Sequence, residues 1–338
     1  MSTLQIQGAL QIQGILQFKS YNRANVIATL IGAWGTAVNA FNDLYVADSN
    51  NKLHKISTAT FNDTIIAGTG VAGYGGDGQL AVTAKINAPF GFAFDSNNNI
   101  YFSDAGNNRI RKIDFITGII TTIAGTGAGG YNGDNILATT AQVKGPRGLV
   151  FDAVGNLYFA DTFNQRIRKI DTSGIITTIA GTGVLGFSGD TGLAINAQFQ
   201  NPSDVKLDNL GNLYISDSGN NRVRKIDTSN IITTYVGNGT TAITDNVPAT
   251  STGMNQPFCL AFDPGYANLY MSNYFGAGIY AVNQSTQYGS IFAGNAGPAG
   301  IRLISLNRPI GVTLDPAGTY MYIGDSFNNR VVRIKMSQ

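Results

Sequence analysis

One segment recurs along this chain with little change, and its period restricts the fold more than any other feature. The three best copies read NIYFSDAGNNRIRKID, NLYFADTFNQRIRKID and NLYISDSGNNRVRKID, and they start at residues 99, 156 and 212. Weaker copies cover 43–56, 268–282 and 320–334. The aligned positions are 56, 57, 56, 56 and 52 residues apart, so six units fill the chain from about residue 25 to about residue 335. These positions hold Asp48, Asp104, Asp161, Asp217, Asn273 and Asp325.

Each unit carries four strand signals. In the second unit they are GFAFD, NIYFSD, RIRKID and GIITTIAG, which are rich in β-branched and aromatic residues and are separated by polar or glycine-containing turns. Four short strands per unit, repeated six times, is typical of propeller blades. We therefore predict an all-β chain whose residues 21–338 form a single six-bladed β-propeller of four-stranded antiparallel blades.

The two ends of the chain complement each other. The last unit ends after three strands, whereas an additional strand signal, NVIATLIG at 25–32, precedes the first unit and matches the outer strand GIITTIAG. We expect this N-terminal strand to complete the last blade, because that pairing closes the ring and removes an open edge.

The repeated residues also carry a family resemblance. The pattern Pro-x-Gly-apolar-x-apolar-Asp, followed by Asn-Leu/Ile-Tyr-apolar-x-Asp-x-x-Asn-x-Arg-Ile/Val, resembles the NHL repeat over more than nine-tenths of the chain. Propellers of this family include binding domains and some enzymes. The resemblance therefore implies the fold and leaves the function open.

The acidic residues and the histidine limit the possible chemistry. All 20 acidic residues are aspartates, and His54 is the one histidine. A zinc site built from several histidines is excluded, and a Ser–His–Asp or Cys–His centre would have to use His54, which we expect to be solvated. Most aspartates occupy repeat positions; we place the remaining Asp43, Asp63 and Asp204 near turns.

Enzymes with similar propellers use residues that this chain lacks. Those resembling gluconolactonase or strictosidine synthase use a glutamate in the central channel, and the amidating lyases use zinc-binding histidines. We therefore predict that the protein is not an enzyme and uses no metal and no cofactor. An asymmetric cluster of polar residues in the channel would instead favour an enzyme of unknown type.

We assign structural roles to most of the repeated charges. An aspartate that ends the second strand precedes an arginine by five residues, as in Asp104 and Arg109, and we predict that the two pair across the turn. In the loops 68–84, 125–141 and 181–197 we predict that Asp77, Asp134 and Asp190 cap short helical turns. A calcium site is the alternative, but it needs several acidic ligands and each loop offers one.

The basic residues are spread around the ring. The net charge is only +2, and 14 of the 22 lysines and arginines lie in the third strands of the blades. We interpret these residues as a solvated rim and do not expect nucleic acid as a partner. We see no signal peptide and no membrane-spanning segment.

Two groups of aromatic residues are candidates for binding. Tyr74, Tyr131 and Phe187 occupy equivalent loop positions, where they form either a partner-binding ring or packing beneath the loops. Blades five and six break the repeat, so an asymmetric site is expected near Tyr274, Phe275 and Tyr280.

Residues 1–20 form a tail outside the repeats, in which LQIQG occurs twice. The alternation of Leu4, Ile6, Leu10 and Ile12 with glutamines predicts a strand with one apolar face. Such a strand serves either to pair with another chain or to lie on the protein's own surface.

The sequence thus favours a non-catalytic module for protein binding or assembly, for example a surface or virion-type subunit that uses the tail as its anchor. The alternative is a propeller that binds a small ligand or a glycan on its loop face. A cell-surface, extracellular or virion-associated location is preferred over a cytoplasmic one.

Overall fold

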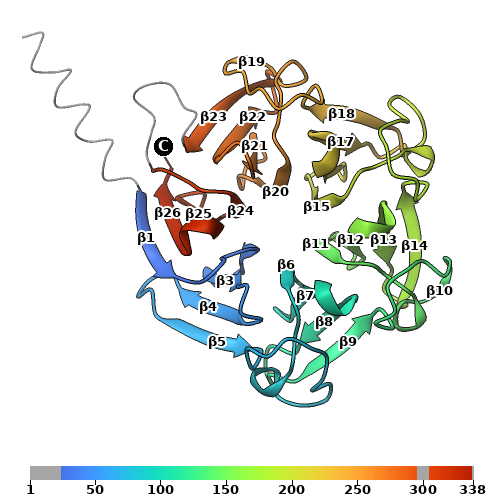
Figure 1. The fold of residues 1–338 in the computed structure, drawn as a ribbon, viewed down its shortest axis with the longest axis vertical. Helices are drawn as coiled ribbons and strands as arrows, with labels where there is room; N and C mark the ends of the chain where they lie inside the picture. The colour runs from blue at the N-terminus through green and yellow to red at the C-terminus, as the bar shows by residue number, and fades with distance from the viewer. Residues whose placement is uncertain (1–23, 295–303, 337–338) are drawn as a thin grey trace, which may run out of the picture.

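The fold is known from a computed structural model, which describes residues 24–294 and 304–336. Six antiparallel sheets of four or five strands stand around a central axis, as predicted (Figure 1). No helix of the described residues is long and apolar enough to cross a membrane. The prediction of a single six-bladed β-propeller is therefore confirmed for the part of the chain that the structure describes.

Within each blade the chain runs from the innermost strand to the outermost one. Blade 1 contains β2 (Thr36–Val38), β3 (Asp43–Ala47), β4 (Leu53–Ser57) and β5 (Asp63–Ala67). Blade 2 contains β6 (Pro89–Phe94), β7 (Ile100–Asp104), β8 (Arg109–Ile113) and β9 (Ile120–Ala124). Blade 3 contains β11 (Pro146–Phe151), β12 (Leu157–Asp161), β13 (Arg166–Ile170) and β14 (Ile175–Ala180), with β10 (Ile136–Leu137) added outside β14.

The other three blades follow the same order. Blade 4 contains β15 (Pro202–Leu207), β16 (Leu213–Asp217), β17 (Arg222–Ile226) and β18 (Ile232–Val236). Blade 5 contains β20 (Pro257–Phe262), β21 (Asn268–Asn273), β22 (Gly278–Asn283) and β23 (Tyr288–Gly294), with β19 (Val247–Pro248) added outside β23. Blade 6 contains β24 (Pro309–Leu314), β25 (Tyr320–Asp325) and β26 (Arg330–Lys335), and its fourth strand is β1 (Ala24–Thr29).

The N-terminal strand closes the ring as expected. β1 pairs antiparallel with β26, from Ala24 opposite Ile334 to Thr29 opposite Arg330. The strand ends three residues before the predicted limit of residue 32, where Gly32 adopts a left-handed conformation with φ of 59°. The hydrogen bond from the Gly32 N–H to Asn329 Oδ1 fixes this turn against blade 6.

Loops between blades wrap the outer edges of four sheets. The loop that leaves each of blades 1 to 4 crosses to the next blade and pairs with that blade's outermost strand, through β10 and β19 or through the bridges Leu80–Ile119 and Leu193–Ile231. Because an uncovered strand edge invites pairing with other chains, this wrapping protects the sheets of blades 2 to 5.

The short helical turns in these loops differ from the prediction. They are 3-10 turns, such as Ala81–Thr83, whose N-cap is Leu80 and which receive no side-chain cap. The expected caps Asp77, Asp134 and Asp190 lie elsewhere, because their carboxylates bind buried arginines, as described below.

Candidate functional site

Buried arginines link three of the loops to their blades. Arg111 is fully buried and donates to Asp104 at 3.1 Å and to Asp77 of the preceding loop at 2.6 Å. The equivalent arginines Arg168 and Arg224 lie in the same environment, Arg168 between Asp161 and Asp134 and Arg224 between Asp217 and Asp190. The predicted solvated rim is therefore wrong for these arginines, because their charges are neutralised inside the protein.

The predicted pairing partner was also wrong in blades 2 to 4. Arg109 donates to the carbonyl oxygens of Asn107 and Thr126 rather than to Asp104. The pairing across the turn is present in blade 6, where Arg330 binds Asp325 at 2.7 Å. It forms there because Val332 stands at the position of Arg111 and leaves the aspartate without the buried arginine.

His54 takes the place of Arg111 in blade 1, and it too is buried rather than solvated. Its two ring nitrogens lie 3.3 Å from Asp48 and 2.9 Å from Asp63. Burial lowers the pKa of His54, but the hydrogen bonds and charges of these two aspartates outweigh it, so the pKa is raised above its ordinary value. Asp63 is the first residue of β5 and follows the turn at 58–60 closely, which agrees with its predicted position near a turn.

The three loop aromatics cover the arginines. Tyr74 lies under Arg109, with 3.6 Å between the guanidinium carbon and the ring centroid, and its hydroxyl donates to Asp77. Tyr131 and Phe187 stack in the same way on Arg166 and Arg222 at 3.9 Å. Each ring is 39–44% exposed, so one face packs beneath the loop while the remainder is accessible.

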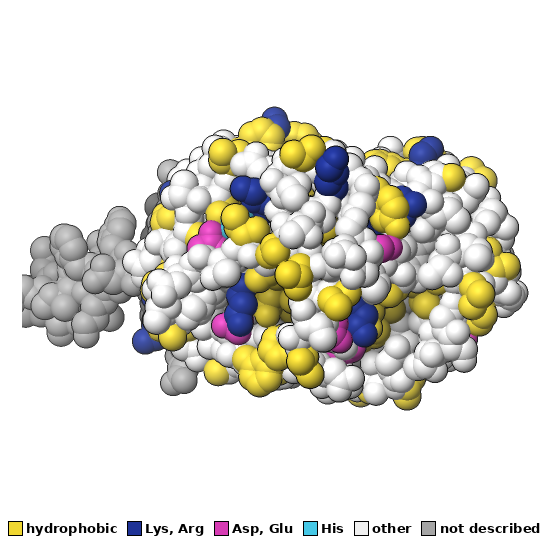
Figure 2. Space-filling view, turned by 90° about the horizontal axis from the view of Figure 1, so that it is seen from below, with side chains coloured by type: hydrophobic (Ala, Val, Ile, Leu, Met, Phe, Trp, Pro, Cys, Tyr) yellow, Lys and Arg dark blue, Asp and Glu magenta, His cyan; other side chains and the backbone are white. Residues whose placement is uncertain are grey.

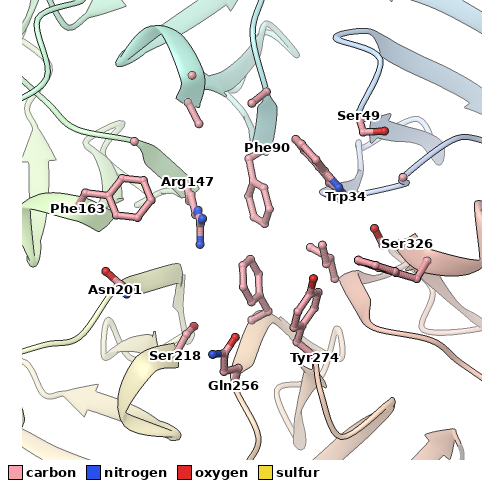
Figure 3. Close-up of a pocket in the computed structure, with 18 of the residues that line it drawn as sticks. Trp34, Ser49, Phe90, Arg147, Phe163, Asn201, Ser218, Gln256, Tyr274 and Ser326 are labelled. Carbon is pink, nitrogen blue, oxygen red and sulfur yellow. The ribbon is translucent and has the colours of Figure 1, made fainter.

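A pocket opens where the axis meets the face that carries these loops. It has a volume of about 830 Å³. Five of its lining residues occupy one repeat position, which in blades 2, 3, 5 and 6 is the second residue of the innermost strand (Figure 3). In blade order they are Trp34, Phe90, Arg147, Phe258 and Ile310. Trp34 lies two residues before β2, and the equivalent residue of blade 4, Ser203, does not line the pocket.

Aromatic side chains dominate the walls. Phe163, Tyr274 and Phe327 come from the turns between the second and third strands of blades 3, 5 and 6 and face the pocket (Figure 3). The rings of Phe258 and Tyr274 lie 5.5 Å apart, as do those of Phe90 and Phe258. Flat apolar surfaces on several sides suit a flat ligand.

Arg147 is the one charged residue that lines this pocket within the described part of the chain. Its guanidinium lies 5.0 Å from the ring centroid of Phe258 and 5.5 Å from those of Phe90 and Phe163. Burial lowers the pKa of Arg147 to about 10, so it is charged at neutral pH. No carboxylate of the described residues forms an ion pair with it.

The nearest acidic residue of the channel is already neutralised. Asp204 lies in β15 on the neighbouring blade, not near a turn as predicted, and is 2% exposed. Its carboxylate accepts hydrogen bonds from the Leu260 N–H at 2.8 Å and from Lys206 Nζ at 3.1 Å. Asp204 therefore does not compensate the charge of Arg147.

The expected asymmetric site is only partly where the sequence placed it. Tyr274 lines the pocket and Phe275 contacts it edge to face, with 4.7 Å between the ring centroids. Arg308 lies over Phe327 at 4.3 Å on the same side. Tyr280 is 1% exposed in the core of blade 5, where its hydroxyl donates to Thr244 O. It fills the position of Arg111 and is not available to a ligand.

Arg147 was missed in the sequence, although a signal for it exists. Aligning the repeats gives PFG, PRG, PSD, PFC and PIG, so the second position is an arginine only in blade 3. Residues that recur mark the structure shared by all blades, whereas a site on the axis is marked by the position that varies from blade to blade. The tail residues Leu4, Ile6, Leu10 and Ile12 lie outside the described residues.

The fold and the ring of repeats define the class of six-bladed propellers, and comparison with known families is consistent with this. The model of the NHL repeat matches residues 199–226, and that of the teneurin NHL domain matches residues 127–187. Together with the repeated motif, these matches show that residues 127–187 and 199–226 are similar to NHL repeats.

The chain is similar to parts of longer proteins. It is 25% identical to human NHL repeat-containing protein 2 over 264 residues, which is 69% of this chain and 36% of that protein. It is 32% identical to chicken teneurin-1 over 157 residues, which is 41% of this chain and 6% of teneurin-1. The chain thus spans much less than two thirds of these relatives.

Several solved structures share the fold. An auxiliary nutrient binding protein from Bacteroides thetaiotaomicron aligns with a TM-score of 0.66 at 15% identity, over 90% of this chain and 69% of that chain. A streptogramin B lyase aligns with a TM-score of 0.58 at 14% identity, over 93% and 99%. A chain of a nidogen/laminin complex aligns with 0.55 at 17%, over 83% and 84%. At these identities the similarity concerns the fold alone.

Proposed function

We propose that the protein is a binding module whose axial pocket takes a small ligand with a flat apolar body and an anionic group. The observation that carries this proposal is Arg147, a cation without an acidic partner, placed between aromatic rings in a pocket of about 830 Å³. Arg147 is half-buried, and the pocket walls remove part of the water around its charge; an anionic ligand compensates for that loss.

The pocket is better suited to binding than to catalysis. Among the described residues, its lining contains no carboxylate, no histidine and no cysteine, so no ordinary general base lines the pocket to activate its serines as nucleophiles. The serines and amides at its walls, such as Ser326 and Asn201, are suited to orienting a polar ligand (Figure 3). A neutral glycan fits the aromatic walls as well, but it leaves Arg147 unpaired.

The fold relatives are compatible with several roles. One is described as a nutrient binding protein, one as a lyase, and one belongs to a complex of two proteins. Binding of a protein partner on the loop face, next to the half-exposed Tyr74, Tyr131 and Phe187, therefore stands beside the small-ligand proposal.

The test compares an aromatic acid with its uncharged analogue by titration calorimetry. We expect naphthoate to bind the pocket more tightly than naphthol, and Arg147→Met to weaken naphthoate binding about tenfold to a hundredfold, as expected for hydrogen bonds to a charged group. Naphthol binding should not change.

The matched control is Arg333→Met. Arg333 also stacks on two aromatic rings, those of Phe61 and Tyr320, but it does not line the axial pocket. Equal naphthoate affinities of Arg147→Met and the wild-type protein, or equal losses in both variants, would contradict the proposal.

A further inference from the structure

Blade 1 has an open outer edge. In blades 2 to 5 the outermost strand is paired on its outer side with a loop from the preceding blade, whereas no segment of residues 24–294 or 304–336 pairs with the outer side of β5. The reason is that the connection from β1 to β2 is only a few residues long and passes straight to the axis. Alternate residues of β5 therefore direct their N–H and C=O groups away from the sheet.

This edge exposes apolar side chains that an apolar segment can cover. Ile65 is 41% exposed and stands where the other blades have Thr122, Thr178 and Thr234, which bind the aspartates of the covering loops. Beside β5 lies a groove of about 290 Å³, lined by Ile65, Leu80, Val82 and Phe115 among others. Figure 2 views the ring from the lower border of Figure 1, where β5 and β9 lie, and shows hydrophobic side chains on this side.

In blade 1 the aspartate that binds the buried cationic position comes from the blade itself and not from a covering loop. Asp63 of β5 itself binds His54, as Asp77 of the loop binds Arg111 in blade 2. The edge of β5 is thus free to accept a segment without an acidic residue, and residues 1–20 contain none.

We propose that residues 4–13 of the same chain form a strand along the outer edge of β5, with Leu4, Ile6, Leu10 and Ile12 toward the groove. In the covered blades the covering segment follows the outer strand of the preceding blade. The blade that precedes blade 1 is blade 6; its outer strand is β1, and residues 1–23 precede the N-terminal end of this strand in the chain, whereas the covering loops follow the C-terminal end of theirs. Residues 14–23 span up to about 33 Å when extended, which is enough to join neighbouring blades.

Pairing within one chain is favoured over pairing with another copy. A short connection within one chain gives the tail an effective concentration in the millimolar range beside its own blade. The alternation of apolar residues and glutamines gives the strand one face for the groove and one for water.

Engineered disulfides test the proposal on the full-length chain. A cysteine is placed at Thr64, an exposed residue of β5, and combined in turn with Gln5→Cys, Gln7→Cys, Gln11→Cys or Gln13→Cys. The matched control carries the cysteine at Thr121, which is equally exposed at the equivalent position of β9, where the edge is already covered. Cys259 is buried and remains in all variants.

We expect at least one Thr64→Cys pair to form a disulfide within the monomer, and none of the Thr121→Cys pairs to do so. Hydrogen exchange provides a second measurement: in a chain that starts at Tyr21, the amides of 63–67 should exchange about tenfold or more faster than in the full chain. A disulfide found only between two chains, or unchanged exchange of β5, would overturn the proposal.

Discussion

Blades 2, 3 and 4 attach the segment outside them through the same buried residue type, whereas blades 1, 5 and 6 each have a different residue at that position. In the regular blades a fully buried arginine joins the aspartate at the end of the second strand to an aspartate of the wrapping loop. At the same position blade 1 has His54, blade 5 has Tyr280 and blade 6 has Val332.

The difference follows what lies outside each blade. Blade 5 keeps a loop, and Tyr280 reaches it through the carbonyl oxygen of Thr244. Blade 6 has the N-terminal strand as its outer strand, and blade 1 provides Asp63 from its own outer strand. The buried arginine is therefore a device that attaches a loop, and it is absent where the loop is absent or attached by other means.

The largest effect is expected from removing one of these arginines. Arg168→Ala leaves Asp161, which is fully buried, and Asp134 without their cation. Breaking a buried ion pair costs about 3–5 kcal/mol, so the midpoint of thermal unfolding should fall clearly.

The control is Lys169→Ala, next to Arg168 in the same strand but half-buried over the ring of Tyr158. It should change the free energy of unfolding by less than about 1 kcal/mol. If the two substitutions had equal effects, the distinction between buried and rim cations would be lost.

A smaller effect on stability is expected in blade 1, and unlike that of the arginines it depends on pH. Arginine stays charged throughout the physiological range, but His54 does not. Its pKa in the folded state is raised above the value of 6.5, so the folded state holds the proton more tightly than the unfolded state. This contribution to stability is complete below pH 6.5 and is lost as the pH rises through the raised pKa.

Because His54 is the one histidine of the chain, NMR can follow its ring signals directly. Asp63→Asn removes one of its two carboxylates and should move the midpoint of the titration to lower pH. Asp43→Asn, whose aspartate pairs with Lys55 instead, should not. An unchanged midpoint in Asp63→Asn would show that Asp63 does not act on His54.

The smallest expected effect is a gain in the free energy of unfolding. Five of the six blades hold the next blade by a side-chain amide: Asn108 Oδ1, for example, accepts from the Gly145 N–H at 2.9 Å. Blade 5 has Ala277 at this position, in the same left-handed conformation with φ of 51°. Asparagine tolerates that conformation well, and Ala277→Asn should therefore stabilise the ring.

We expect a gain of about 0.5–1.5 kcal/mol, the net worth of one hydrogen bond, measured by denaturant unfolding. Asn108→Ala should produce a loss of similar size. A destabilising Ala277→Asn would mean that blades 5 and 6 are not arranged like the others.

The repeat predicted the ring, the order of strands and the closing strand, because each depends on periodicity within the sequence. The partner of Asp104 was not predictable in this way. Arg109 and Arg111 are two residues apart and share one face of β8, and the choice between them is made by Asp77, which comes from a different blade.

The pocket was predicted in part, and for a similar reason. The irregular turn at Tyr274 was visible as a departure from the repeat, but Tyr280 departs from it too and is buried. Whether a residue that differs from the repeat faces the axis depends on its position within the blade. The lining residues lie at the repeat position of Arg147, just before the innermost strands, as Gly145 does, and in the turns between the second and third strands, so the position within the blade identifies Arg147.

The pairing of β1 with β26 also sets the order of events during synthesis. Among the strands of the ring, β1 is synthesised first and has to wait for β26, which is synthesised last, because Ala24 pairs opposite Ile334. Until then the exposed partner edges are those of β1 and of the unfinished blade, and loop closure over nearly the whole chain comes last. Once formed, the same contact makes the ring resist opening from either end, since neither terminus can peel away without breaking a complete strand pair.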